Sequence, residues 1–202
     1  MKTTTSRALY GYWQMLRQDR PAPDRRDVKP DGLRDILANT FILEAGDDAV
    51  AFPFRLAGSC LSQLYCRDLR GRDFLNLWRG ADREAVATLV LAIHEEAAAA
   101  VIGYKAHTHR GTSVDVEITL LPLAQEGLDD RFPRILGSAS LLSDPYWIGV
   151  HPVQRHELTS LRLIWPDEKP WFLRKAQART AAIHTAPKAR HGHLVVYDGG
   201  RA

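Results

Sequence analysis

Two cysteines are the side chains of this sequence best suited to covalent chemistry. Cys60 and Cys66 stand six residues apart in a segment with helical spacing, so their side chains point about 240° apart around a helix axis and a local disulfide is not expected. We predict two buried thiols in a reducing compartment. The alternative is a small hydrolase or transferase with Cys60 as its nucleophile. Because the sequence has neither a nucleophile elbow nor a phosphate-binding glycine loop, we predict no enzyme.

Histidines are the obvious candidates for metal ligands, and the sequence has eight of them. His107 and His109 share one face of a predicted strand with Asp115 near their reach, and His191 and His193 lie close to the C-terminus. Neither group supplies the three or four ligands at fixed spacing that a structural zinc site requires. We therefore predict no metal site, and the sequence leaves the question of any other cofactor open.

Two arginines are candidates for holding an anionic ligand. Arg55 lies within a predicted strand, next to Phe54, and Arg72 ends an irregular stretch that passes over the predicted sheet. In a sensor such an arginine can face a cavity and pair with an anion. The alternative is a surface ion pair with an acidic residue such as Asp68 or Asp73.

The composition predicts one globular core with a basic tail. The chain has 202 residues, of which 45% are hydrophobic and 25% are charged, as is usual for a single folded domain. Residues 166–202 hold seven basic and three acidic side chains, so the tail carries +4 and the remainder −1 of the net +3. Since few aromatic side chains are interleaved with these charges, we do not expect nucleic-acid binding. We predict a short amphipathic helix at residues 171–183, and we expect residues 186–202 to be poorly ordered.

The sequence predicts neither secretion nor membrane insertion. The polar N-terminus leads into no apolar signal segment, and no apolar run approaches the ~18 residues that a membrane span requires. We therefore expect a cytoplasmic protein with no membrane partner.

A narrow apolar stripe marks the first element, a helix predicted from about residue 6 to 20. Its members, Leu9, Tyr12, Trp13 and Leu16, recur at three- and four-residue spacing. The stripe has two possible roles. It can cover a sheet of the same chain, or it can pair with its counterpart in a second subunit as an isologous contact.

The next segments predict a mixed α and β domain. Short helices are predicted at 31–37, capped by Asp31, and at 59–65, capped by Ser59; a long helix capped by Asp82 runs to about residue 100. His94 lies on that helix beside two glutamates, away from its apolar stripe, so a haem-ligand role is not expected. Strands are predicted at 40–45, 50–57, 101–108, 112–123 and 134–143. A last apolar element at 158–165 is a strand or a helical turn. An antiparallel five-stranded sheet with helices on one face follows.

The strand register around residue 110 can be derived from the sequence. A three-residue loop, 109–111, places Gly111 at the left-handed position that such loops favour. Tyr104 then lies opposite Val116 on an apolar face, and Lys105 lies opposite Asp115 on the other. A two-residue loop would mix charged and apolar side chains on each face, so we predict the longer loop.

Three short motifs resemble those of a known family. They are Tyr12-Trp13-x-x-Leu16-Arg17 in the first helix, the turn from Arg25-Arg26-Asp27 to Pro30, in which either arginine is the counterpart of the family's, and the strand end Arg55-Leu56-Ala57-Gly58. Together they resemble the PAS-like family of small single-domain bacterial proteins. The resemblance covers roughly residues 6–148. It implies the PAS plan of a five-stranded antiparallel sheet, a sensing or adaptor role in signalling, and dimerisation through a helix that precedes the first strand.

The resulting hypothesis is a non-enzymatic, cytoplasmic PAS-like regulatory domain. An N-terminal helix and linker (1–30) precede a PAS-like domain (31–148) and a C-terminal extension (149–202). The domain is expected to act through homodimerisation and a protein signalling partner, with a small ligand as a possible control; the alternative is a structural adaptor without a ligand. The candidate dimer interface is Leu9, Tyr12, Trp13 and Leu16. The candidate pocket between sheet and helices is Phe52, Phe54, Arg55, Leu64, Phe74, Ile93, Tyr104 and Val116.

Overall fold

The structure is a computed structural model that describes residues 1–46, 49–127, 131–165, 189–191 and 194–196. Helical elements come before each group of strands along the chain, broadly in the order that the sequence predicts. The helical elements are α1 (Thr4–Arg17), η1 (Arg25–Asp27), η2 (Pro30–Asn39), α2 (Ser59–Tyr65), η3 (Phe74–Leu77) and α3 (Gly80–Glu96). The strands are β1 (Thr40–Glu44), β2 (Phe54–Ala57), β3 (Ala99–Thr108), β4 (Ser113–Leu123), β5 (Arg134–Leu141), β6 (Val153–Ile164), β7 (Ala189–His191) and β8 (Leu194–Val196). No helix in these ranges is long and apolar enough to span a membrane.

The main sheet is antiparallel and has six strands, in the order β2-β1-β5-β4-β3-β6. The prediction of five strands is therefore wrong by one. The sixth, β6, is the element predicted at 158–165 as a strand or a turn, and it begins five residues earlier, at Val153. It pairs along the whole of β3. Without it, β3 would be an unpaired edge with a row of free backbone N–H and C=O groups.

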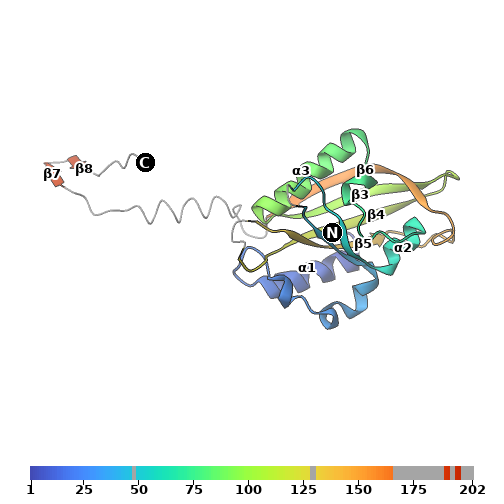
Figure 1. The fold of residues 1–202 in the computed structure, drawn as a ribbon, viewed down its shortest axis with the longest axis horizontal. Helices are drawn as coiled ribbons and strands as arrows, with labels where there is room; N and C mark the ends of the chain where they lie inside the picture. Colours follow the sequence, from blue (N-terminus) through green and yellow to red (C-terminus); the bar gives the residue numbers. More distant parts are fainter. Residues whose placement is uncertain (47–48, 128–130, 166–188, 192–193, 197–202) are drawn as a thin grey trace.

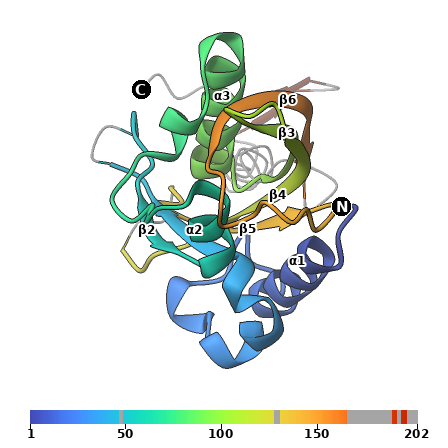
Figure 2. The ribbon, with the colours of Figure 1, turned by 90° about the vertical axis from the view of Figure 1, so that its right-hand side faces the viewer.

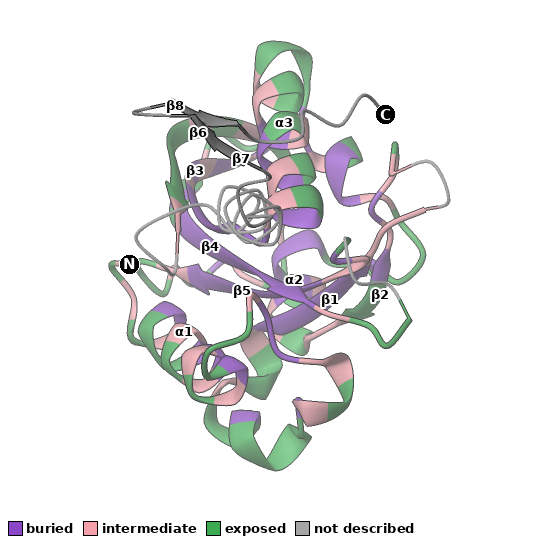
Figure 3. Cartoon of the chain, turned by 90° about the vertical axis from the view of Figure 1, so that its left-hand side faces the viewer, coloured by how far each residue is buried: buried purple, intermediate pink, exposed green. Residues whose placement is uncertain are grey.

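Helices cover both faces of this sheet. In Figures 1 and 2 the helix α3 lies on one side of the strands, with α2 towards the same side, and α1 lies on the opposite side. The prediction of helices on one face therefore holds for α2 and α3, while α1 covers the other face. Figure 3 shows the reason, because the central strands β4 and β5 are buried along most of their length. A strand that is buried on both faces needs a covering layer on each side.

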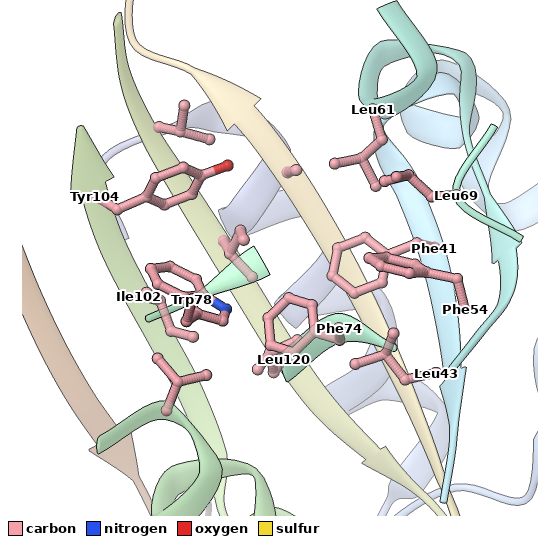
Figure 4. Close-up of a cluster of buried hydrophobic side chains, with 14 of the residues drawn as sticks. Phe41, Leu43, Phe54, Leu61, Leu69, Phe74, Trp78, Ile102, Tyr104 and Leu120 are labelled. Atoms are coloured by element: carbon pink, nitrogen blue, oxygen red, sulfur yellow. The ribbon is translucent and has the colours of Figure 1, made fainter. Parts of the chain in front are cut away.

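The apolar residues divide into two clusters, one on each face of the sheet. The larger cluster lies between the sheet, α2, η3 and α3, and Figure 4 shows its centre, where the rings of Phe41, Phe54 and Phe74 meet. The smaller cluster joins α1 to the other face, with Leu9 and Trp13 against Leu121 and other sheet residues. Alternation along β4 produces this division, since successive side chains point to opposite faces.

The predicted register between β3 and β4 is confirmed. Tyr104 pairs with Val116 and Lys105 with Asp115, and Lys105 Nζ lies 2.9 Å from the Asp115 carboxylate. Gly111 has a φ of +80°, the left-handed conformation that a glycine adopts without steric penalty. The hairpin of β1 and β2 also forms, although β2 begins at Phe54 and its connecting loop is longer than the predicted turn.

The predicted helix caps are wrong by one to three residues. Asp31, Ser59 and Asp82 all lie inside the first turn of their helices. The residues in the cap positions, none of which makes a side-chain cap hydrogen bond, are Lys29, Gly58 and Arg79. Asp82 has a tertiary role instead, because its carboxylate accepts a hydrogen bond from the Leu158 N–H of β6 at 3.0 Å. The Leu158 amide lies beside an irregularity in the pairing of β3 with β6, where a backbone donor needs such a partner.

The C-terminal tail is described only in part. Residues 166–188, and with them the predicted helix at 171–183, lie outside the described residues. Within residues 186–202, which we expected to be poorly ordered, β7 and β8 pair with each other in antiparallel fashion. The strand β6 lies within the extension expected from residue 149 onward, and it belongs to the main sheet.

A close backbone approach explains the glycine that ends β2. A Cβ on Gly58 would lie 2.4 Å from the Ala38 carbonyl oxygen and 2.7 Å from that of Thr40. Both contacts are to backbone atoms, which cannot move aside as a flexible side chain can. Gly58 also donates its N–H to Thr40 O at 2.8 Å, so the two segments are held together at this point.

We predict that Gly58→Ala lowers the free energy of unfolding by roughly 1–3 kcal/mol, the usual range for overpacking. The matched control is Gly11→Ala on α1, where nothing lies within 4 Å of an added Cβ. That change should stabilise the protein by roughly 0.5–1 kcal/mol, because glycine is a poor helix residue. Urea unfolding of both variants tests the prediction, and equal effects of the two substitutions would contradict it.

Candidate functional site

The structure brings most of the predicted pocket residues together. Seven of the eight belong to the larger apolar cluster and are buried: Phe52, Phe54, Leu64, Phe74, Ile93, Tyr104 and Val116. The eighth, Arg55, faces away from the cluster, because it neighbours the inward-pointing Phe54 and strand side chains alternate between faces. Its side chain is 68% exposed and pairs with Glu44 at 3.6 Å, not with Asp68 or Asp73. The second arginine candidate, Arg72, donates to the Asp68 backbone carbonyl.

Aromatic side chains fill the centre of the predicted pocket. The ring centroids of Phe41 and Phe54 lie 5.5 Å apart, and those of Phe54 and Phe74 lie 5.9 Å apart in an edge-to-face arrangement. Trp78 continues the contacts, 6.2 Å from Phe74 and 5.1 Å from Tyr104. Trp78 is also a polar exception in this core, since its buried indole N–H has no hydrogen-bond partner among the described residues. Such donors are rare in native cores.

A polar cluster that the sequence did not predict lies next to this core. His156 of β6 is surrounded by the rings of Tyr65, Trp78 and Tyr104, with centroids 5.6, 5.3 and 5.0 Å away. Its Nδ1 lies in hydrogen-bond contact with the Leu77 carbonyl oxygen, which can only accept, so Nδ1 carries the proton. Nε2 is then free to accept a hydrogen bond from the Tyr65 hydroxyl, 2.8 Å away. The only sequence signal was a predicted strand that began at residue 158, too late to include this histidine.

The environment of this cluster holds its side chains in their neutral forms. Burial lowers the pKa of His156 to about 4, and the positive charges of His107 and Arg67 add to the effect, while the Leu77 carbonyl opposes it. Burial also raises the pKa of Tyr104 to about 12 and the pKa of Tyr65 well above its usual value. The cluster is therefore uncharged near neutral pH.

Hydrogen bonds to a glutamate fasten the residues just before α1, including its N-cap Thr3, to the face of the sheet that α1 covers. The Glu117 carboxylate of β4 accepts from the backbone N–H groups of Lys2 at 2.7 Å and Thr3 at 2.9 Å, and from the Thr3 hydroxyl. Burial raises the pKa of Glu117, but the hydrogen bonds from Thr3, Lys2 and Ser6 outweigh burial, and the net pKa is lowered. The negative charge also lies at the positive end of the helix dipole.

The second half of α1 is held by apolar packing and by two of the motif residues. Trp13 is fully buried and donates its indole N–H to the Pro122 carbonyl at 2.7 Å. The Tyr12 hydroxyl accepts from the Lys29 N–H at 2.9 Å, and its ring lies over Gly32, where a Cβ would be 2.3 Å from the ring. These contacts give the Tyr-Trp motif a structural role, which is to dock the helix and its linker on the sheet.

The predicted dimer stripe is thus in contact with its own chain. Leu9 and Trp13 are fully buried, while Tyr12 and Leu16 are half-buried at the edge of the same cluster. Of the two roles that the sequence left open, the structure shows the first, covering of the sheet. A dimer contact through Leu9 and Trp13 would require α1 to leave this position, and the interface stays a prediction.

The sheet surface beneath α1 is polar towards the start of the helix. Thr119, Ser138 and Ser140 alternate with inward-facing residues on β4 and β5, so they lie on the same face as Leu121. Their hydroxyl groups are buried and make no hydrogen bond within the described residues. A hydroxyl that loses water without gaining a partner costs about 1–3 kcal/mol. This half of the α1 contact is therefore less favourable than the apolar half.

The surroundings of the candidate cysteines and histidines do not favour a catalytic or metal-binding role. Cys60 is half-buried and Cys66 is exposed, so the prediction of two buried thiols is wrong. Burial raises the pKa of Cys60, whereas a nucleophilic cysteine needs a lowered pKa. His94 is buried, against expectation, with its ring 3.0 Å from the Phe132 carbonyl oxygen. His107 Nε2 lies 3.1 Å from the Glu157 carboxylate. Among the described residues, no three potential metal ligands lie together.

Comparison with known proteins identifies the family. A PAS domain family model matches residues 1–140, which contain α1 and all the main strands up to most of β5. The chain therefore belongs to the PAS domain family, whose members are typically sensory signalling modules. The family match confirms the resemblance seen in the sequence. No curated protein matches the chain.

Several solved structures resemble the chain weakly. A LOV protein of Rhodobacter sphaeroides aligns with a TM-score of 0.43 and 14% identity, over 56% of this chain and 66% of that protein, slightly less than two thirds of its length. The light state of the blue-light photoreceptor Aureochrome1 LOV aligns with a TM-score of 0.41 and 19% identity, over 57% of this chain and 90% of that one. Similarity at this level does not extend to ligand or function.

We predict that the stability of the protein falls as the pH drops from about 6.5 to 4. In this window the unfolded chain protonates His156, with an ordinary pKa of about 6.5, while the folded chain does not, because its pKa is about 4. The unfolded state then binds more protons, so the free energy of unfolding decreases, by roughly 3 kcal/mol in total.

Urea unfolding at several pH values measures this effect, and His156→Gln should remove most of it. The control is His109→Gln, which removes an exposed histidine from the β3–β4 turn and should leave the pH dependence unchanged. If His156→Gln unfolds with the same pH dependence as the unmodified protein, the assignment is wrong.

Proposed function

We propose that this PAS domain is a non-enzymatic regulatory module that acts through protein contacts controlled by the docking of α1. The observation that carries the proposal is the divided contact between α1 and the sheet. One half is apolar and holds Trp13, and the other half rests on Glu117 and on three hydroxyl groups without partners. A cytoplasmic location and a bacterial signalling role remain predictions from the sequence.

The divided contact supports a helix that can leave its docked position. Undocking would return the hydroxyls of Thr119, Ser138 and Ser140 to water, where each finds a partner, so this part of the contact opposes docking. The Glu117 hydrogen bonds favour docking. A helix held by opposing terms of similar size responds to modest changes in binding free energy, which is the condition for a population shift.

Release of α1 would expose two apolar surfaces at once. The helix would expose the Leu9 and Trp13 stripe, and the sheet would expose the apolar face around Ile42, Leu121 and Leu136. Pairing of two such helices gives the homodimer that the sequence predicts, and a signalling partner can bind the same surfaces. Regulation would then consist of a change between a covered and an uncovered state of the sheet.

We expect Glu117→Gln to increase the opening of α1 about tenfold or more. Hydrogen bonds to charged groups contribute about 1.5–3 kcal/mol, and the neutral amide loses the charge that favours them. Hydrogen exchange of residues 4–17 measures the opening, and light scattering after size-exclusion chromatography measures dimer formation. Both should rise in the variant.

The matched control is Asp115→Asn, which neutralises a carboxylate two residues away on the same face. Asp115 pairs with Lys105 near the surface and makes no hydrogen bond to α1, so helix exchange and mass should stay unchanged. Faster exchange in Glu117→Gln without any dimer would contradict dimerisation through α1. Unchanged exchange would contradict the docking control itself.

A ligand-controlled sensor is the second candidate function, favoured by Trp78. The unpartnered indole N–H of Trp78 lies within the predicted pocket, against Tyr104 and Phe74, and it could donate to an acceptor on a small molecule. Since the phenylalanine rings fill the centre of the core, such a molecule would have to displace side chains.

Native mass spectrometry of the purified full-length chain distinguishes the two candidates. A co-purified small molecule that is lost in Trp78→Phe would support the ligand-controlled sensor. A measured mass equal to that of the polypeptide alone, together with faster exchange of α1 and dimer formation in Glu117→Gln, would support control by α1 without a ligand in the core.

A further inference from the structure

We propose that the arginine-rimmed hollow between the end of α2, the η3–α3 connection and β6 is a binding site for a small oxyanion, such as a phosphoryl or carboxylate group. It lies outside the predicted pocket and apart from the α1 contact, so it goes beyond the function proposed above. The residues that matter are Tyr65 and His156 at its inner side, Arg67 and Arg79 at its rim, and the amides of Asn76 and Gln154.

The side chains that line the hollow favour negative charge. Arg67 and Arg79 are both exposed, and neither forms an ion pair with an acidic side chain among the described residues. No acidic residue lines the hollow in this part of the chain. Guanidinium groups present several N–H donors in a planar fork that matches the oxygen atoms of phosphate and carboxylate groups. The amide groups of Asn76 and Gln154 supply further donors.

The position of the hollow separates it from an ordinary patch of surface arginines. Its volume is about 260 Å³, several times the ~30 Å³ share of one water molecule, so a phosphate-sized anion fits with its hydration. Its inner side is fixed, because His156 is held by Leu77 on one nitrogen and Tyr65 on the other. Arg67 lines the same hollow as His156 and Tyr65, and its positive charge lowers the pKa of both.

Another arginine-lined hollow lacks these features. This hollow, of about 460 Å³ at the edge of β2, includes Arg55 and Arg70 but also Glu44. Glu44 already pairs with Arg55 at 3.6 Å and with Arg134 at 2.8 Å. Because a carboxylate occupies that site, an added anion would be repelled, and the site beside His156 is the better candidate.

Isothermal titration calorimetry on the full chain tests the proposal, with inorganic phosphate in one arm and succinate in the other at constant ionic strength. We expect saturable binding of at least one anion. The Arg67→Gln and Arg79→Gln variants should each weaken binding about tenfold or more, the range expected for loss of a charge-assisted hydrogen bond. The matched control is Arg83→Gln, an equal charge change at an exposed arginine of α3 that does not line the hollow.

Each outcome decides the proposal. Saturable phosphate binding that both hollow variants weaken, and the control does not, supports a phosphoryl ligand; the same result with succinate alone supports a carboxylate. Titrations of both anions that never saturate overturn the proposal. Binding that survives both hollow substitutions, or that Arg83→Gln weakens equally, also overturns it. Circular dichroism of each variant checks that it is folded, as we expect for substitutions of exposed side chains, so that a loss of binding is not mistaken for a loss of structure.

Discussion

The constraint on which this structure depends is that its central strands are buried on both faces. Along β4, apolar residues on one side pack under α3 and those on the other side, such as Leu121 and Leu123, pack under α1. With a single covering layer, the second face of such a sheet would expose a large apolar surface to water. The N-terminal helix is therefore part of the fold, and any change in its docking is felt by the sheet.

The dependence of the sheet on α1 is the basis of the proposed regulatory role of this helix. The helix is fastened by Glu117 at its start and by Trp13 farther along, and between them lie hydroxyl groups that gain nothing from being covered. A purely structural contact would place apolar side chains there. In a PAS domain, this mixture is consistent with a cover that must be firm enough to keep the sheet hidden yet loose enough to move.

The sixth strand adds a histidine, His156, to the aromatic side chains of the domain core. β6 carries His156 next to Tyr65, a residue 91 positions earlier in the chain, and its pairing with β3 brings the histidine against Tyr104 and Trp78. The family match ends at residue 140, so this strand and its histidine lie beyond it. The arginine-rimmed hollow exists only because β6 supplies part of its lining, with Val153, Gln154 and His156.

Local patterns in the sequence were enough to predict the strands β1 to β5, the long helix, and the register from Tyr104–Val116 to Lys105–Asp115. They also singled out seven side chains, nominated for a pocket, that the structure buries together. These features depend on which side chains of a single element are buried. Buried apolar residues recur every second residue in a strand and about every 3.6 residues in a helix, so the sequence shows them directly. Tertiary structure alone decided that α1 hides its own stripe, that Arg55 faces outward, and that β6 pairs with β3. The reason is physical. Leu161 and Leu163 of β6 are exposed although they are apolar, so the residue pattern of this strand does not show which face is covered. The partner of an edge strand or of a covering helix is chosen by surfaces that meet only after the chain has folded.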